Sequence, residues 1–126
     1  MRSDATIVGI GLMVHMAQEA AGRLAMEGTT VEVIDPRTLA PLDMEATLAS
    51  VHKTGRLLIV GEDFAPCGMA AEIATQVMEQ AFDDLDAPVR RLTGVACPAP
   101  YSPALMPHMV PDATQIAEAV RSLCAE

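Results

Sequence analysis

Gly9 and Gly11 separate a short apolar run from a helical pattern in the stretch TIVGIGLMVHMAQEAA. A second apolar run, VEVI, is followed at once by Asp35. A strand, a G-x-G turn, a helix, a strand and an acid outline a dinucleotide site, in which the helix start binds pyrophosphate and the acid binds ribose. However, Val14 occupies the position of the third glycine, and the chain has no G-K-[ST] tripeptide. The partial motif therefore favours a tight strand-to-helix turn over a nucleotide site.

Glu62, Asp63 and Cys67 form a second group of reactive side chains, in the stretch GEDFAPCG after the apolar run RLLIV. This stretch is expected to be a loop. Paired carboxylates can do acid–base chemistry, but they also cap helices, and both alternatives stay open. Cys67 precedes a helical pattern whose free N–H groups would favour a thiolate. Because no neighbouring base completes a catalytic cysteine, a packing role is favoured for this residue.

The histidines and the only tyrosine are isolated from one another in the sequence. His15, His52 and His108 have no second ligand at metal-binding spacing, so we expect no metal site. Tyr101 lies in the stretch CPAPYSPALMP, which cannot form a regular helix because proline removes a backbone donor. This long loop is expected either to pack along a neighbouring subunit or to cover an edge of its own sheet.

The elements that must position these residues alternate between strand and helix four times. The expected strands are 5–10, 31–34, 56–60 and 89–93, and the expected helices are 13–27, 44–55, 69–82 and one capped by Asp112. Such alternation predicts an α/β fold with helices on both faces of a mainly parallel sheet. The run at 56–60 is apolar without alternation, which indicates burial on both faces. The 126 residues are expected to form one domain, 1–126.

Composition excludes several classes of function. The net charge of −9, from 17 acidic and 8 basic residues, argues against nucleic acid as a partner and suits a basic protein. The three cysteines, at 67, 97 and 124, form no C-x-x-C motif, so reduced thiols in the cytoplasm are expected. No signal peptide is visible, and no apolar run reaches the length of about 18 residues that a membrane span needs.

The order of motifs resembles one family over nearly the whole chain, from about Thr6 to Leu123. The stretches VEVIDPRTLAPLD, LDAPVRRLTG and PYSP are the most specific pieces. They are similar to the C-terminal domain of the beta subunit of 2-oxo acid dehydrogenases of the pyruvate and acetoin type, in the transketolase C-terminal domain family. The resemblance implies a three-layer α/β/α sandwich on a five-stranded mixed sheet with one antiparallel strand. The fifth strand is expected in the connection after Pro36 or in the tail loop.

The resemblance also implies a role in a larger oxidoreductase. In the family, thiamine diphosphate and magnesium are held by the alpha subunit and by the N-terminal half of the beta subunit. This chain is therefore expected to be a fragment of a longer beta subunit, with Met1 to Asp4 as an added start. It is expected to hold no cofactor and to catalyse no reaction by itself. The implied partners are an alpha subunit, a second beta subunit in a homo-oligomer or heterotetramer, and the subunit-binding domain of a lipoyl acyltransferase core in a multienzyme complex.

The surface residues that would make these contacts fall into two groups. The docking candidates are acids near the LDAP turn and the chain end: Asp83, Asp84, Asp86 and Glu126. The candidates for a subunit interface are Glu62, Phe64, Cys67 and Tyr101. The docking acids could equally do no more than solvate a surface turn. The alternative function is a free-standing regulatory module that binds a nucleotide or small ligand at the Gly9–Gly11 loop and Glu62.

Overall fold

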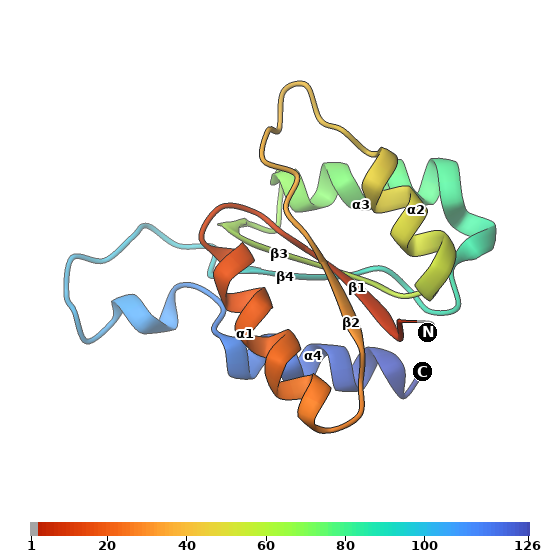
Figure 1. The fold of residues 1–126 in the computed structure, drawn as a ribbon. Helices are drawn as coiled ribbons and strands as arrows, with labels where there is room; N and C mark the ends of the chain where they lie inside the picture. Colours follow the sequence, from red (N-terminus) through yellow and green to blue (C-terminus); the bar gives the residue numbers. More distant parts are fainter. Residues whose placement is uncertain (1–2) are drawn as a thin grey trace.

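The computed structural model describes residues 3–126 as three layers, with a central sheet between two pairs of helices (Figure 1). Met1 and Arg2, which belong to the expected added start, lie outside the described residues. The strands are β1 Ala5–Gly9, β2 Val31–Ile34, β3 Leu57–Phe64 and β4 Arg90–Gly94. The helices are α1 Met13–Met26, α2 Glu45–Thr54, α3 Met69–Ala81 and α4 Ala113–Cys124, with short 3-10 turns η1 Phe82–Asp84 and η2 Met106–His108. The predicted α/β/α sandwich is confirmed.

Within residues 3–126 the sheet has four strands in the order β2-β1-β3-β4, and every pairing is parallel. The expected fifth, antiparallel strand is wrong at both of its expected places. The connection after Pro36 holds only one isolated bridge, between Leu39 and Leu42, which closes a local turn. In the tail loop the prolines lack donors, and the Val95 N–H bonds the Met109 carbonyl of the same loop at 3.0 Å.

The sheet divides the apolar interior into two cores. Leu58 and Val60 of β3 face α1 and α4, whereas Leu57 and Ile59 face α2 and α3. All four side chains are at most 1% exposed. This confirms the expectation that the third strand is buried on both faces, since a parallel sheet covered by helices leaves neither side to water. No helix within residues 3–126 has both the length and the apolar character that crossing a membrane requires.

β3 is longer than expected. The structure extends it through Gly61 to Phe64, where the sequence suggested a loop. Phe64 pairs with Gly94 after a register irregularity beyond Val60, so the strand continues past its apolar run as a partner of β4. The sequence did not predict this extension because Glu62 and Asp63 are polar, and polar side chains are uncommon in a buried parallel strand.

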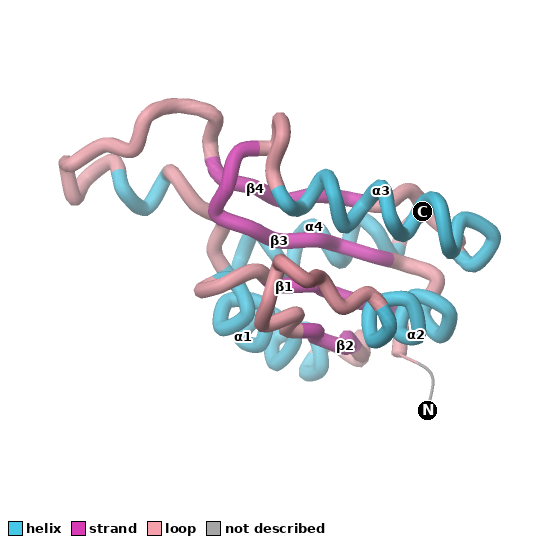
Figure 2. Tube along the Cα trace, turned by 90° about the horizontal axis from the view of Figure 1, so that it is seen from above, coloured by secondary structure: helices cyan, strands magenta, loops and turns pink. Residues whose placement is uncertain are grey.

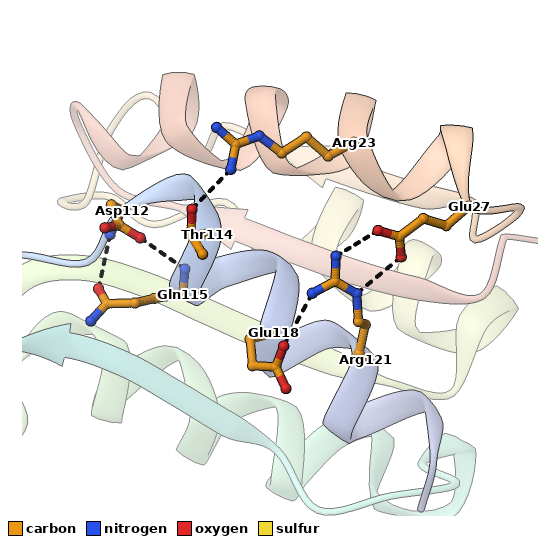
Figure 3. Close-up of polar contacts among 7 residues, drawn as sticks. All are labelled: Arg23, Glu27, Asp112, Thr114, Gln115, Glu118 and Arg121. Carbon is orange, nitrogen blue, oxygen red and sulfur yellow. Dashed lines mark hydrogen bonds and ion pairs between the residues drawn. The ribbon is translucent and has the colours of Figure 1, made fainter.

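α1 and α4 lie side by side on one face, and polar contacts on their outer surface join them (Figure 3). Arg121 donates two hydrogen bonds to the Glu27 carboxylate, at 2.9 and 2.6 Å. These bonds hold the pKa of Glu27 below its ordinary value. Asp112 caps α4 by accepting the Gln115 N–H at 2.8 Å, while the Gln115 side chain accepts the Asp112 N–H at 3.0 Å. The predicted capping box is thus present and fixes the start of α4.

A buried hydroxyl cluster joins α2 to β1 and β2 on the opposite face. Thr6 shares hydrogen bonds with Ser50 at 2.7 Å and with Thr54 at 2.8 Å. Ser50 donates to the Glu32 carboxylate, which also accepts from Lys53 at 3.0 Å. The Ser50 hydrogen bond first, and then that of Lys53, lower the pKa of Glu32. The three buried hydroxyls therefore all have partners within the chain, as burial of polar groups requires.

Candidate functional site

Exposed apolar side chains lie together at the end of the sheet where the strands have their carboxyl ends, which we name the carboxyl edge; the opposite end is the amino edge. Because all four strands are parallel, their carboxyl ends and the loops that follow them meet at a single edge. Of the ten large hydrophobic side chains that are exposed among the described residues, seven lie in or follow the carboxyl ends of strands. We name these seven the carboxyl-edge set: Leu12, Leu39, Phe64, Val95, Tyr101, Leu105 and Met106. Scattered exposed hydrophobics are normal, but their concentration at one edge indicates a contact surface.

The loop 95–111, which we name the proline arm, supplies most of the carboxyl-edge set. It extends away from the sheet in two perpendicular views (Figures 1 and 2). Its base is anchored by the bond between Val95 and Met109 and by the capped start of α4. Tyr101 in the arm is 100% exposed, so it does not cover the domain's own sheet edge. Of the two alternatives left open for this loop, the structure does not support covering of its own sheet edge, and packing against another chain stays a prediction.

The proline arm carries no Asp, Glu, Lys or Arg in a chain whose net charge is −9. One side of it forms an open hollow of about 410 Å³. The hollow is lined almost entirely by apolar atoms from Val95, Cys97, Pro98, Pro100, Leu105, His108 and Met109. The Cys97 thiol lies 3.8 Å from the Met109 sulfur in this lining. An uncharged, apolar and conformationally restricted segment is suited to burial against a second apolar surface.

Asp63 has a structural role at the carboxyl end of β3. Its Oδ2 accepts the Met69 N–H at 2.7 Å and so caps α3. A Cβ at Gly61 would lie 2.6 Å from Asp63 Oδ1, and one at Gly68 would overlap Oδ2. Asp63 Oδ1 is buried and has no hydrogen-bond partner among the described residues. For the pair Glu62 and Asp63 this geometry supports the capping alternative, and Glu62 points into solvent as an exposed residue.

Phe64 and Cys67 stand on the same turn into α3. Phe64 is 48% exposed at the last position of β3. Cys67 is exposed and adopts a positive φ of 60°, between Pro66 and the helix-starting Gly68, so the packing role favoured for this residue is wrong. Both residues lie at the carboxyl edge, as do Glu62 and Tyr101, so the four candidates for a subunit interface share one edge of the sheet. Their contact with another chain remains a prediction.

The glycine loop is a tight turn between β1 and α1. A Cβ at Gly9 would lie 2.8 Å from Val14 Cα, so the glycine allows the strand and the helix to approach closely. Gly11 has a φ of 63°, which favours glycine. Asp35 accepts the Arg37 N–H at 2.9 Å and closes its own turn. These contacts agree with the structural interpretation of the partial G-x-G motif.

The four docking acids lie at the opposite, amino edge of the sheet, and three of them are engaged within the chain. Asp84 contacts His52 at 3.1 Å, and Glu126 forms an ion pair with Arg90. Asp86 packs against Gly55 and donates its N–H to the Gly55 carbonyl at 2.7 Å. Asp83 is exposed. The structure thus places these residues at the same end of the sheet, and their role in docking stays a prediction.

Among residues 3–126, no group of three or more His, Cys, Asp or Glu side chains is arranged to hold a metal ion. A thiamine diphosphate site needs a magnesium ion bound by oxygen ligands beside the diphosphate. At the carboxyl edge Asp63 caps α3 through Oδ2 and Asp35 closes a turn, whereas Glu62 is a single exposed carboxylate. These carboxylates do not form a set of oxygen ligands for magnesium within residues 3–126, and whether the chain binds the cofactor stays a prediction.

Comparison with known proteins identifies the family of this domain. Residues 1–116 match the sequence profile of the family described as transketolase, C-terminal domain. The chain belongs to the transketolase C-terminal domain family. It is 48% identical over 118 residues to the acetoin:2,6-dichlorophenolindophenol oxidoreductase subunit beta of Cupriavidus necator, which covers 94% of this chain and 35% of the relative. It is 41% identical to the pyruvate dehydrogenase E1 component subunit beta of Rhizobium meliloti, with 96% and 26% coverage.

A solved structure gives the same family fold. A split-gene transketolase, described as an inactive beta4 tetramer, superposes with a TM-score of 0.85 at 27% identity and covers 99% of this chain and 40% of its own. The chain thus spans about a third of the length of the curated relatives it matches, or less. The resemblance stated from the motifs is confirmed.

Sequence reasoning missed part of the carboxyl-edge set. Five members were not predicted, although each follows a predicted strand: Leu12, Leu39, Val95, Leu105 and Met106. The available signal was their position: in a parallel sheet, apolar residues just beyond strand ends have no second layer to cover them. Met78 of α3 and Phe82 of η1 were also not predicted, because the helical spacing indicates the buried face of α3 and not which exposed residues border a groove.

Proposed function

We propose that this chain is the C-terminal assembly domain of the beta subunit of a thiamine-diphosphate-dependent 2-oxo acid or acetoin dehydrogenase that acts in the cytoplasm. The observation that carries the proposal is the carboxyl-edge set, with its uncharged proline arm. Similarity to two dehydrogenase beta subunits supports the choice of enzyme. The structural neighbour's description as a beta4 tetramer supports self-association of such chains.

In this proposal the carboxyl edge contacts the alpha subunit and a second beta subunit. Burying a side chain such as Tyr101, Leu105 or Met106 stabilises an interface by about 1.5–3 kcal/mol each. The prolines of the arm reduce the conformational freedom that association must remove. Thiamine diphosphate and magnesium belong to other parts of the parent enzyme, so this domain supports assembly and supplies no catalytic group.

The proposal gives the amino edge a second task, docking of a basic subunit-binding domain of the lipoyl acyltransferase core. The candidates remain Asp83, Asp84, Asp86 and Glu126. Charge steering by acids accelerates the encounter with a basic module, and the chain's net charge of −9 supports it. Because three of these acids have partners within the chain, docking would have to share or displace those contacts.

The experiment is sedimentation equilibrium of the purified chain over a wide concentration range, with a thermal-shift assay in thiamine diphosphate and Mg²⁺. We expect reversible association that strengthens with concentration and no saturable thermal shift. A chain that stays monomeric at every concentration contradicts the assembly role. A saturable shift with the cofactor contradicts its assignment to other parts of the enzyme.

A further inference from the structure

The flank of α3 beside β4 carries a groove that the assembly role does not use. Ala71, Ala74, Thr75 and Met78 recur at helical spacing along this flank, next to the buried face of α3 against which Ala74 also packs. They line a hollow of about 410 Å³ together with Glu79 and Arg91. Met78 also lines a second hollow, of about 530 Å³. The second hollow is completed by Phe82, Asp83, Leu85, Asp86, Ala87 and Pro88. We name the two adjoining hollows the α3 groove.

Large apolar side chains are exposed along this groove. Met78 is 44% exposed and Phe82 is 63% exposed, and they account for two of the three exposed large hydrophobics outside the carboxyl-edge set. The alanines make the floor shallow, so an apolar side chain of a bound segment can approach the helix backbone closely. A row of apolar positions about three turns long matches what an amphipathic segment requires.

The charges around the groove are asymmetric. Glu79 and Asp83 line it four residues apart, and neither side chain has a hydrogen-bond or ion-pair partner among the described residues. Asp86 adds a third carboxylate at the same end. The only base in the lining is Arg91, at the far end, which donates to the Ala65 carbonyl at 2.8 Å. An acidic rim beside an apolar floor is complementary to a cationic, amphipathic partner.

From this juxtaposition we propose that the α3 groove docks an amphipathic protein segment whose apolar side chains are flanked by Lys or Arg. The inference rests on the docking part of the proposed function and goes beyond it in two respects. It adds Glu79, Met78 and Phe82 to the docking surface. It also makes apolar contact, in addition to charge, a requirement for binding, with Met78 and Phe82 as the anchors.

The test uses NMR chemical-shift titration of the full chain with three synthetic 18-residue peptides. The first peptide has leucines at helical spacing with lysines between them, the second replaces leucine by serine, and the third replaces lysine by glutamate. We expect only the first to bind, with shifts centred on Ala71, Ala74, Met78 and Ala87. The affinity should fall as salt rises, because exposed charges are screened.

Matched variants localise the binding. Met78→Ser, and separately Glu79→Gln with Asp83→Asn, should each weaken binding about three- to tenfold, as loss of an anchor or of rim charges does. Two controls should bind unchanged: Met26→Ser, which removes a methionine that is 91% exposed, and Glu45→Gln with Glu118→Gln, which removes two charges elsewhere. The charge variants leave the apolar contacts intact, so they still test whether the peptide binds at the groove even if Met78→Ser perturbs folding.

Three results would overturn the inference. The first is binding of the serine peptide as tightly as the leucine peptide, because charge alone would then account for binding. The second is binding that the control substitutions weaken as much as the groove substitutions do, and the third is no binding of the leucine peptide. Each outcome is separable from the assembly proposal, because peptide binding at α3 and self-association at the carboxyl edge are measured on different surfaces of the same chain.

Discussion

The two edges of the sheet differ in how many of their surface groups have bonding or packing partners within the chain. At the amino edge, Asp84 pairs with His52 and Glu126 pairs with Arg90, and beneath this surface the buried hydroxyl cluster around Thr6 is fully hydrogen-bonded. At the carboxyl edge, the proline arm presents Tyr101 fully to solvent. The amino edge therefore pairs most of its acids within the chain but still exposes Phe82, whereas the carboxyl edge exposes an uncharged, apolar loop.

The difference indicates which edge requires another molecule. Polar groups at a monomer's surface can be satisfied by water or by local partners, whereas a cluster of apolar groups lowers its free energy only by contact with another apolar surface. At the amino edge, water and local ion pairs satisfy the polar groups, and the acids there could also bind a basic partner. The carboxyl edge is an incomplete surface that assembly would complete.

The largest expected effect is at the base of the proline arm. A Cβ at Gly94 would overlap the Glu62 carbonyl and lie 3.0 Å from the Met109 carbonyl, both of which are backbone atoms that yield with difficulty. Gly94→Ala should lower the free energy of unfolding by about 1–3 kcal/mol and loosen the arm, as overpacking does. Urea unfolding gives the first quantity, and hydrogen exchange of the Val95 amide gives the second.

Gly22→Ala is the matched control for this substitution. Gly22 lies within α1, and a Cβ there meets nothing within 4 Å. Replacing it should raise the free energy of unfolding by about 0.5–1 kcal/mol, because alanine favours the helix. If Gly94→Ala unfolds at the same urea concentration as the wild type, the arm is not anchored as described.

A smaller effect is expected from the hydroxyl cluster that closes the amino edge. Ser50→Ala removes a donor to Glu32 and a partner of Thr6, and should cost about 1–2 kcal/mol of unfolding free energy. Thr75→Ala, whose hydroxyl donates only to the Ala71 carbonyl on an exposed helix face, is the control and should cost less.

Ser50→Ala also tests how the free energy of unfolding depends on pH. Since folding lowers the pKa of Glu32, its contribution to stability is present above the pKa of the unfolded chain and is lost as the pH falls through the folded pKa. Ser50→Ala removes the largest cause of the lowered pKa, so the variant should lose less stability than the wild type on acidification below about pH 4.5. Unfolding curves in urea at pH 7 and in mild acid measure this; equal acid sensitivity contradicts it.

The smallest effect concerns the ion pair between Arg90 and Glu126. Both side chains are partly exposed, at 52% and 31%. Glu126→Gln should therefore change the free energy of unfolding by about 0–1 kcal/mol, and less at high salt. A larger, salt-independent loss would show that the amino edge depends on this pair more than its exposure suggests.

The sequence predicted the layers and element order well, because long-range burial leaves a local pattern. The helical spacing of α1 and the unbroken apolar run of β3 both follow from helices covering a parallel sheet. The capping box of α4 was predictable from Asp112 and Gln115 alone, since its hydrogen bonds span three residues. Such features depend on neighbours in sequence.

The features that the sequence did not predict depend on residues far away in the sequence or on the absence of packing partners. The extension of β3 through Phe64 follows from its pairing with Gly94, which no local pattern encodes. The direction of the proline arm, away from the sheet, follows from where both of its ends are fixed (Figure 2). The sequence predicted Tyr101 as a contact residue, whereas the gathering of Leu12 and Leu39 at the same edge required the strand order.

Sedimentation velocity of a double variant, Tyr101→Ser with Leu105→Ser, tests the central claim most directly, with Met26→Ser as the control. Both sets of substitutions remove exposed apolar side chains, so the monomer should keep its thermal midpoint in each case. The account predicts that the wild type and the control associate, whereas the double variant sediments as a monomer at the same concentrations. Association of the double variant as strong as that of the wild type would contradict the assignment of the carboxyl edge as the assembly surface.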